Sequence, residues 1–130
     1  MFSRIAIIGS QGAIGRALVN EFSQRFPDSC IYAFSRNPSQ EYLPNVIAQE
    51  IDYQDESSIE KASNVAGKSG TIDCIVVATG ILHDDSTKPE KSLRDINQAS
   101  LRHIIDVNTI TPILIAKHFI KINYNDTCII

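Results

Sequence analysis

The feature that most constrains the fold of this chain is a strand–glycine turn–helix stretch over residues 4–19. Ile5 to Ile8 form a short apolar run rich in β-branched residues, which predicts a buried strand. Gly9, Gly12 and Gly15 follow, and the residues after them place apolar side chains at helical spacing. This order is typical of a βα unit in which the turn contacts a ligand.

The three glycines each have a physical role in a turn that binds nucleotide phosphates. Gly9 permits a turn that a Cβ would obstruct, Gly12 lets a pyrophosphate approach the backbone, and Gly15 lets the helix pack close to the strand. The free N–H groups and positive dipole end of the helix then face the phosphates. The spacing is G-x-x-G-x-x-G rather than G-x-G-x-x-G, so a tight turn without a ligand is the alternative.

Composition restricts the class of protein. The 130 residues fit one domain, and 43% hydrophobic with 21% charged residues is ordinary for a globular chain. The net charge of −3 and the lack of a Lys/Arg cluster disfavour nucleic acid as a partner. We expect neither a secretory segment nor a membrane span. Cys30, Cys74 and Cys128 fall in strand-like runs, and we interpret them as buried thiols of a cytoplasmic protein.

Further strands and helices alternate along the chain. We predict strands over residues 30–34, 46–51, 72–78 and 127–130, and helices from about 13 to 26, 55 to 67 and 97 to 121. The alternation predicts an α/β fold of the Rossmann type, a doubly wound parallel sheet with strand order 3-2-1-4-5. The whole chain, residues 1–130, is expected to be one nucleotide-binding domain that ends after the fifth strand.

The end of the second predicted strand indicates which nucleotide binds. An Asp or Glu here would accept hydrogen bonds from an adenosine ribose. The chain instead has Ser35 and Arg36, and the guanidinium of Arg36 suits a 2′-phosphate. We therefore predict NADP as the cofactor, with NAD possible. A solvated surface arginine is the alternative.

Two other strand ends carry candidate site residues. Asp52 follows the third strand and can bind an adenine amino group, or it can simply end the strand and cap the next helix. Ala78, Thr79 and Gly80 close the fourth strand at the edge where ligands bind in open α/β sheets. Gly80 would let a ribose come close, although it could also be an ordinary turn glycine.

Asn108 lies inside the apolar last helix, where an amide needs hydrogen-bond partners. Pro112, four residues later, has no N–H for the Asn108 carbonyl. The pair predicts a bend with a free acceptor. It serves either a functional site or a structural kink satisfied by water.

Together these residues resemble the short-chain dehydrogenase/reductase family. The resemblance rests on the segments 9–15, 78–80 and 107–112 and on Asp52. The loop segments 80–84 and 88–93 are closest to the subgroup similar to the bacterial C-factor protein. Ala13 and Thr79 depart from the family's usual glycine and asparagine.

The resemblance implies an oxidoreductase that exchanges hydride between NAD(P)(H) and a carbonyl or alcohol. The phosphates are assigned to residues of the glycine turn, namely Gly9, Ser10, Gln11, Gly12, Ile14 and Gly15. The 2′-phosphate is assigned to Ser35 and Arg36, the adenine to Asp52, and the ribose to Ala78, Thr79 and Gly80. Asn108 is assigned the proton-relay water and is the catalytic residue.

The family's proton donor is absent from this sequence. None of the four tyrosines has a lysine four residues later, and the family's serine would follow the fifth strand. We therefore expect a cofactor-binding portion without turnover. A non-catalytic nucleotide-sensing or protein-interaction module is the alternative. We also expect a homo-oligomer through the apolar last helix or the exposed sheet edge.

Overall fold

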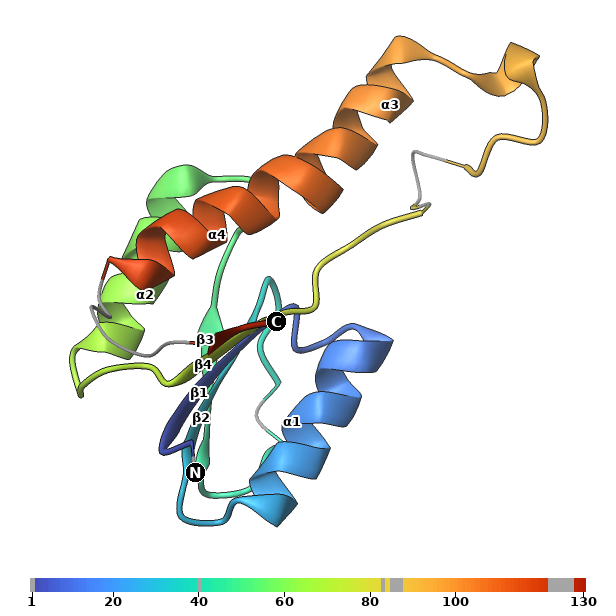
Figure 1. Cartoon of the computed structure of the whole chain (residues 1–130). Helices are drawn as coiled ribbons and strands as arrows, with labels where there is room; N and C mark the ends of the chain where they lie inside the picture. Colours follow the sequence, from blue (N-terminus) through green and yellow to red (C-terminus); the bar gives the residue numbers. More distant parts are fainter. Residues whose placement is uncertain (1, 40, 83, 85–87, 122–127) are drawn as a thin grey trace.

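A computed structural model describes residues 2–39, 41–82, 84, 88–121 and 128–130 of the chain. Strands and helices alternate as the sequence predicts (Figure 1). The elements, in chain order, are β1 (Arg4–Ile8), α1 (Ala13–Arg25), β2 (Cys30–Ser35), β3 (Val46–Glu50), α2 (Glu56–Gly67), β4 (Cys74–Val77), the 3₁₀ turn η1 (Leu93–Asp95), α3 (Gln98–Ile105), the π-helical turn η2 (Asp106–Ile110), α4 (Thr111–Ile120) and β5 (Cys128–Ile129).

The described strands form one parallel sheet in the order β3-β2-β1-β4-β5. The predicted α/β fold and strand order are confirmed. From β1 the chain first adds strands on one side and then crosses to β4 on the other. The reversal opens a crevice at the carboxyl ends of β1 and β4, which is where ligands bind in sheets of this kind.

Helices cover both faces of the sheet (Figure 1). Helix α1 lies on one face, and α2 and α4 lie on the other, while α3 projects away from the sheet. β1 contributes side chains to the hydrophobic core on both faces of the sheet, because alternate side chains of a strand point to opposite sides. Ile5 and Ile7 pack with Val19 of α1, and Ala6 and Ile8 belong to the core under α2 and α4. An apolar run buried on both faces is what a central parallel strand requires.

The predicted last helix over 97–121 is present from Gln98 to Ile120, but its middle, η2, is π-helical rather than α-helical. Asn97 caps α3 by accepting a hydrogen bond from the Ser100 N–H at 2.9 Å. At η2 the helix widens, and the Thr111 N–H donates to the carbonyl of Asp106, five residues back. Pro112 follows and has no N–H to continue the four-residue pattern. The irregularity expected around Pro112 is therefore a π-helical turn.

The apolar side chains of this segment are only partly covered. Val107, Ile115 and Phe119 are buried, whereas four other apolar side chains are exposed: Leu101, Ile105, Ile113 and Ile120. Phe119 packs edge-on against Phe34 of β2, with ring centroids 5.6 Å apart. One narrow stripe of the helix thus joins the core, and a broad apolar stripe faces solvent.

The cysteines do not all behave as predicted. Cys74 is buried and burial raises the pKa of its thiol, but Cys30 is half-buried and Cys128 is exposed. Cys128 lies in β5, which has a neighbouring strand on one side only among the described residues. Thr127 of the predicted fifth strand lies outside the described residues. No cluster of metal-ligating side chains and no helix fit to span a membrane occurs in the described part of the chain.

An ion-pair cluster fastens α2 to α4. Asp55 caps α2 by accepting from the Ser57 N–H at 2.9 Å. The next residue, Glu56, has its Oε1 2.6 Å from Lys117 Nζ and 2.8 Å from Nε2 of the buried His118. Hydrogen bonds from Lys117 and His118 lower the Glu56 pKa to about 2.

This cluster predicts an acid-sensitive part of the stability. The Glu56 pKa is lowered from 4.5 to about 2 in the folded state. At pH values above 4.5 the carboxylate therefore makes its full contribution to the stability of the fold. That contribution is lost as the pH falls from 4.5 through about 2. We expect Glu56→Gln to unfold at lower urea than the wild type near neutral pH, with the difference shrinking toward about pH 3. Glu60→Gln, an exposed change on the same helix, is the control, and a pH-independent difference would contradict this role of Glu56.

Candidate functional site

The glycine turn after β1 has the conformation that the sequence predicts. Gly9 has a φ of 89°, in the left-handed region that favours glycine. The N–H groups of Gly9 and Ser10 both donate to the Phe34 carbonyl at 2.9 Å, and the Gly12 N–H donates to Gly9 O at 3.1 Å. These bonds fold the turn over the ends of β1 and β2.

Gly15 is required by the packing of α1. A Cβ on Gly15 would lie 2.1 Å from the Gly9 carbonyl oxygen, a distance that no side chain can occupy. Gly12 differs, because a Cβ there would lie 3.4 Å from the same oxygen, an ordinary contact. Gly12 is also the N-cap of α1 and supplies no capping side chain. The first turn of α1 contains no acidic residue, so its N–H groups are suited to an anion.

A cavity of about 330 Å³ lies beside this turn at the carboxyl ends of the strands. It brings together eight of the predicted site residues from three separate segments of the chain. These are Gly9, Gln11, Gly12, Ser35, Arg36, Ala78, Thr79 and Gly80. Most of the predicted site residues therefore line one cavity.

The other five predicted residues, Asn108 among them, do not line this cavity. Ser10 and Gly15 are buried behind the turn, and Ile14 is 71% exposed beside a neighbouring groove on the α1 side. The Asp52 carboxylate accepts from the Gln54 N–H at 3.0 Å, and its own N–H donates to Ser58 Oγ at 2.9 Å. These bonds match the strand-ending alternative for Asp52 and do not test adenine binding.

Three buried hydroxyl groups, two on residues that line the cavity and one behind the glycine turn, lack hydrogen-bond partners within the described part of the chain. Ser10 Oγ, Ser35 Oγ and Thr79 Oγ1 are buried and unpaired within the described part of the chain. They follow β1, end β2 and follow β4, respectively. Buried hydroxyls are normally paired, and an unpaired one is costly. Together with the uncapped helix and the missing side chain at Gly12, they fit a polar, phosphate-bearing ligand.

Arg36 is the one charged residue among those that line the cavity, as far as the structure describes it. Its guanidinium carbon lies 5.6 Å from the centroid of the Tyr53 ring, a cation–π arrangement. Ser35 and Asn37 flank it, so no carboxylate follows β2. The electrostatics favour an anionic group at this end of the cavity.

Asn108, the predicted catalytic residue, holds the loop after β4. Its Oδ1 accepts from the Ile81 N–H at 2.8 Å, and its Nδ2 donates to the Ile81 carbonyl at 2.8 Å. A Cβ on Gly80 would lie 3.5 Å from the same Oδ1. The side-chain amide is thus satisfied by backbone, as an amide in a helix requires. These bonds fix the loop at the rim of the cavity.

A second cavity of about 270 Å³ adjoins the first and shares Arg36, Tyr53, Gly80 and Ile81 with it. On its far side, His103 Nε2 of α3 lies 2.7 Å from Asp84 Oδ2 of the loop after β4. This pair connects α3 to the loop that Asn108 also holds.

Sequence reasoning missed Tyr53, Tyr42 and Ile81. Tyr53 lines both cavities, and the Tyr42 hydroxyl accepts from Gln11 Nε2 at 2.9 Å. The position of Tyr53, directly after the strand-ending Asp52, was an available signal for it. Tyr42 and Ile81 lie in loops, and only tertiary contacts bring them to the site.

A family model described as short chain dehydrogenase matches residues 3–126. The chain belongs to this family. Its predicted resemblance is confirmed at the family level. No match was found among curated proteins.

Solved structures of short-chain dehydrogenases and related enzymes share the fold of this family member. The aldohexose dehydrogenase of Thermoplasma acidophilum is 21% identical, with a TM-score of 0.74 over 93% of this chain and 46% of that one. NADPH-bound carbonyl reductase from chicken fatty liver is 17% identical, with a TM-score of 0.78 over 92% and 48%. ElxO with NADP bound is 21% identical, with a TM-score of 0.77 over 93% and 50%. This chain thus spans about half the length of these proteins.

The glycine geometry predicts that two neighbouring alanine substitutions act differently. Gly15→Ala places a Cβ against the Gly9 carbonyl, and we expect a loss of at least about 1–3 kcal/mol in the free energy of unfolding. Gly12→Ala has room for its Cβ and should change stability by less than about 1 kcal/mol. Urea denaturation followed by circular dichroism measures both. Equal losses would contradict the assigned packing role of Gly15.

Proposed function

We propose that this chain binds NADP(H) and is the nucleotide-binding portion of a short-chain dehydrogenase/reductase. The observation that carries the proposal is Arg36 at the end of β2, without a carboxylate beside it. A guanidinium there pairs with a 2′-phosphate, whereas a carboxylate would repel it. The solved structures of ElxO and chicken carbonyl reductase hold NADP and NADPH, respectively.

The residues present fit the two phosphate-bearing parts of this cofactor. The N-terminus of α1 would hold the pyrophosphate, because its N-cap residue, Gly12, has no side chain to cover the N–H groups. Arg36 would hold the 2′-phosphate. The unpaired hydroxyls of Ser35 and Thr79 offer donors and acceptors to the intervening ribose and phosphates. The assignments of Asp52 to adenine and of Ala78 and Gly80 to ribose remain proposals from family resemblance.

The cofactor, when bound, supplies hydride. In this chain the residues at the site bind and orient it, and we propose that the chain catalyses no turnover because no Tyr-x-x-x-Lys occurs in its sequence. The proton-relay role of Asn108 also remains a proposal. Since its amide bonds Ile81 in both directions, the group left for that role is its backbone carbonyl, to which Pro112 can donate nothing.

The finer assignments stay predictions. The C-factor-like subgroup rests on the loop residues 80–84 and 88–93, and the cytoplasmic location rests on the cysteine content. A non-catalytic nucleotide-sensing module is the alternative function. Both functions use the same nucleotide-binding site, and they differ in whether the chain serves a substrate reaction. A measurement of nucleotide binding therefore tests what the two functions have in common.

Arg36→Ala is the direct test of the cofactor. We expect the dissociation constant for NADPH to rise about 10- to 100-fold, the value of hydrogen bonds to a charged group, with little change for NADH. Fluorescence of the reduced nicotinamide measures both. Arg25→Ala, at the other end of α1 and paired with Glu21, is the matched control. Equal losses for NADPH and NADH would reject the 2′-phosphate assignment, and no binding by the wild type would reject the proposed function.

The exposed apolar stripe predicts self-association. Ile105 and Ile113 are 52% and 63% exposed on α3 and α4, and Ile129 and Ile130 lie at the open edge of the sheet. We expect light scattering to show a mass above the monomer that falls with dilution. Ile105→Glu with Ile113→Glu should shift the chain toward the monomer, whereas Leu93→Glu, on the 3₁₀ turn, should not. A wild-type monomer at high concentration would contradict the prediction.

A further inference from the structure

Tyr53 stands where the two cavities meet, and no role was predicted for it. We infer that Tyr53 is a positioning residue that holds the Arg36 guanidinium over the cavity and so sets the preference for a nucleotide with a 2′-phosphate. The inference rests on the proposed binding of NADP(H). It extends that proposal to Tyr53, which would act on the 2′-phosphate indirectly, by holding Arg36 in position.

Arg36 by itself is poorly fixed. It follows the end of β2 in a loop, its side chain is exposed, and no salt bridge to it occurs among the described residues. A long exposed arginine loses much rotamer freedom when it binds an anion. The Tyr53 ring, 5.6 Å from the guanidinium carbon, is the contact that restricts it. Tyr53 thereby lowers the cost of ordering Arg36 on the ligand.

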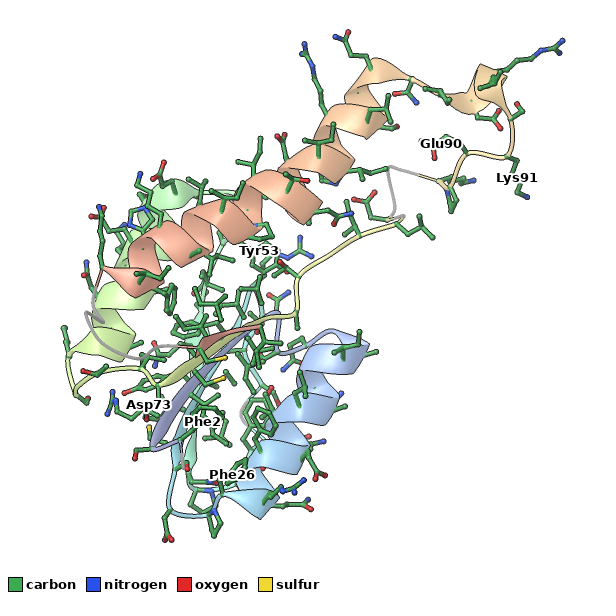
Figure 2. All side chains as sticks on the ribbon, viewed as in Figure 1. Phe2, Phe26, Tyr53, Asp73, Glu90 and Lys91 are labelled. Carbon is green, nitrogen blue, oxygen red and sulfur yellow. The ribbon has the colours of Figure 1, made fainter. Side chains whose placement is uncertain are left out.

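Tyr53 is itself held by rigid parts of the fold. Its carbonyl accepts from Thr111 Oγ1 at 3.0 Å, and Thr111 is only 3% exposed. Its side chain packs against the core cluster beneath α2 and α4. Figure 2 shows Tyr53 between the last helical segment and the strand ends. The Tyr53 ring is therefore held in a fixed position beside the long, exposed side chain of Arg36.

The chemistry of the contact separates the ring from the hydroxyl. A cation–π contact needs the face of the ring and not its OH group. The N–H groups of Arg36 stay available, because no hydrogen bond of this side chain to another group occurs among the described residues and its contact with Tyr53 is to the ring. A 2′-phosphate in the first cavity can then take them, while a ribose with a free 2′-OH gains little from the same arginine.

The test compares NADPH and NADH binding in five forms of the full chain: wild type, Tyr53→Phe, Tyr53→Leu, Arg36→Ala and the double variant Arg36→Ala/Tyr53→Leu. We expect Tyr53→Leu to weaken NADPH by about 3- to 10-fold and NADH by less than about twofold. Tyr53→Phe should match the wild type. The double variant should match Arg36→Ala alone, because the ring acts only through Arg36.

Four results would overturn the inference: equal weakening of NADPH and NADH by Tyr53→Leu, a loss in Tyr53→Phe as large as in Tyr53→Leu, additive losses in the double variant, or no effect of Tyr53→Leu on NADPH. Circular dichroism and thermal unfolding establish that each form is folded. If Tyr53→Leu does not fold, Tyr53→Met replaces it, since methionine fills the space without a ring. Wild-type binding of NADPH with unchanged binding by Tyr53→Leu rejects the inference alone, whereas no wild-type binding rejects the proposed function as well.

Discussion

The close approach of α1 to the glycine turn is the constraint on which the rest of the site depends. The Gly9 carbonyl occupies the place where any side chain at position 15 would begin. Only with glycine at both points can α1 start directly above the end of β1. That start aims the uncapped N-terminus of the helix at the cavity. Gly9 is doubly constrained, because a Cβ there would also lie 2.7 Å from the Ala78 carbonyl at the end of β4.

The opposite side of the site is held in place by the irregular turn of the last helix. Pro112 and the π-helical turn before it widen the last helix where it passes the strand ends. Asn108 uses its whole amide to hold Ile81, and Thr111 holds the backbone of Tyr53. One irregular helical turn thus fixes two loops, one after β4 and one after β3. The site is a set of loops anchored from both sides by helices that the sheet itself orients.

Much of the fold could be predicted from the sequence because its signals are local. The apolar run of Ile5 to Ile8, the three glycines and the alternation of strands with helices specify a doubly wound sheet. The lack of an acid beside Arg36 is equally local. The position of the irregularity in the last helix was also predictable from Pro112, but its π-helical form was not, because apolar periodicity does not reveal a turn that is one residue wider. The burial of Cys128 was wrong because an edge strand has the same composition as a central one.

The sequence by itself determined the glycine turn, the order of the strands and the identity of the residues at the strand ends. Each of these follows from the conformational freedom of glycine or from periodicity along a short segment. Only the tertiary structure decided which of those residues share a cavity, that Asp52 is engaged in a turn, and that Tyr53 lies under Arg36. These depend on contacts between segments far apart in the chain, such as Thr111 with Tyr53, and no local pattern encodes such a distance.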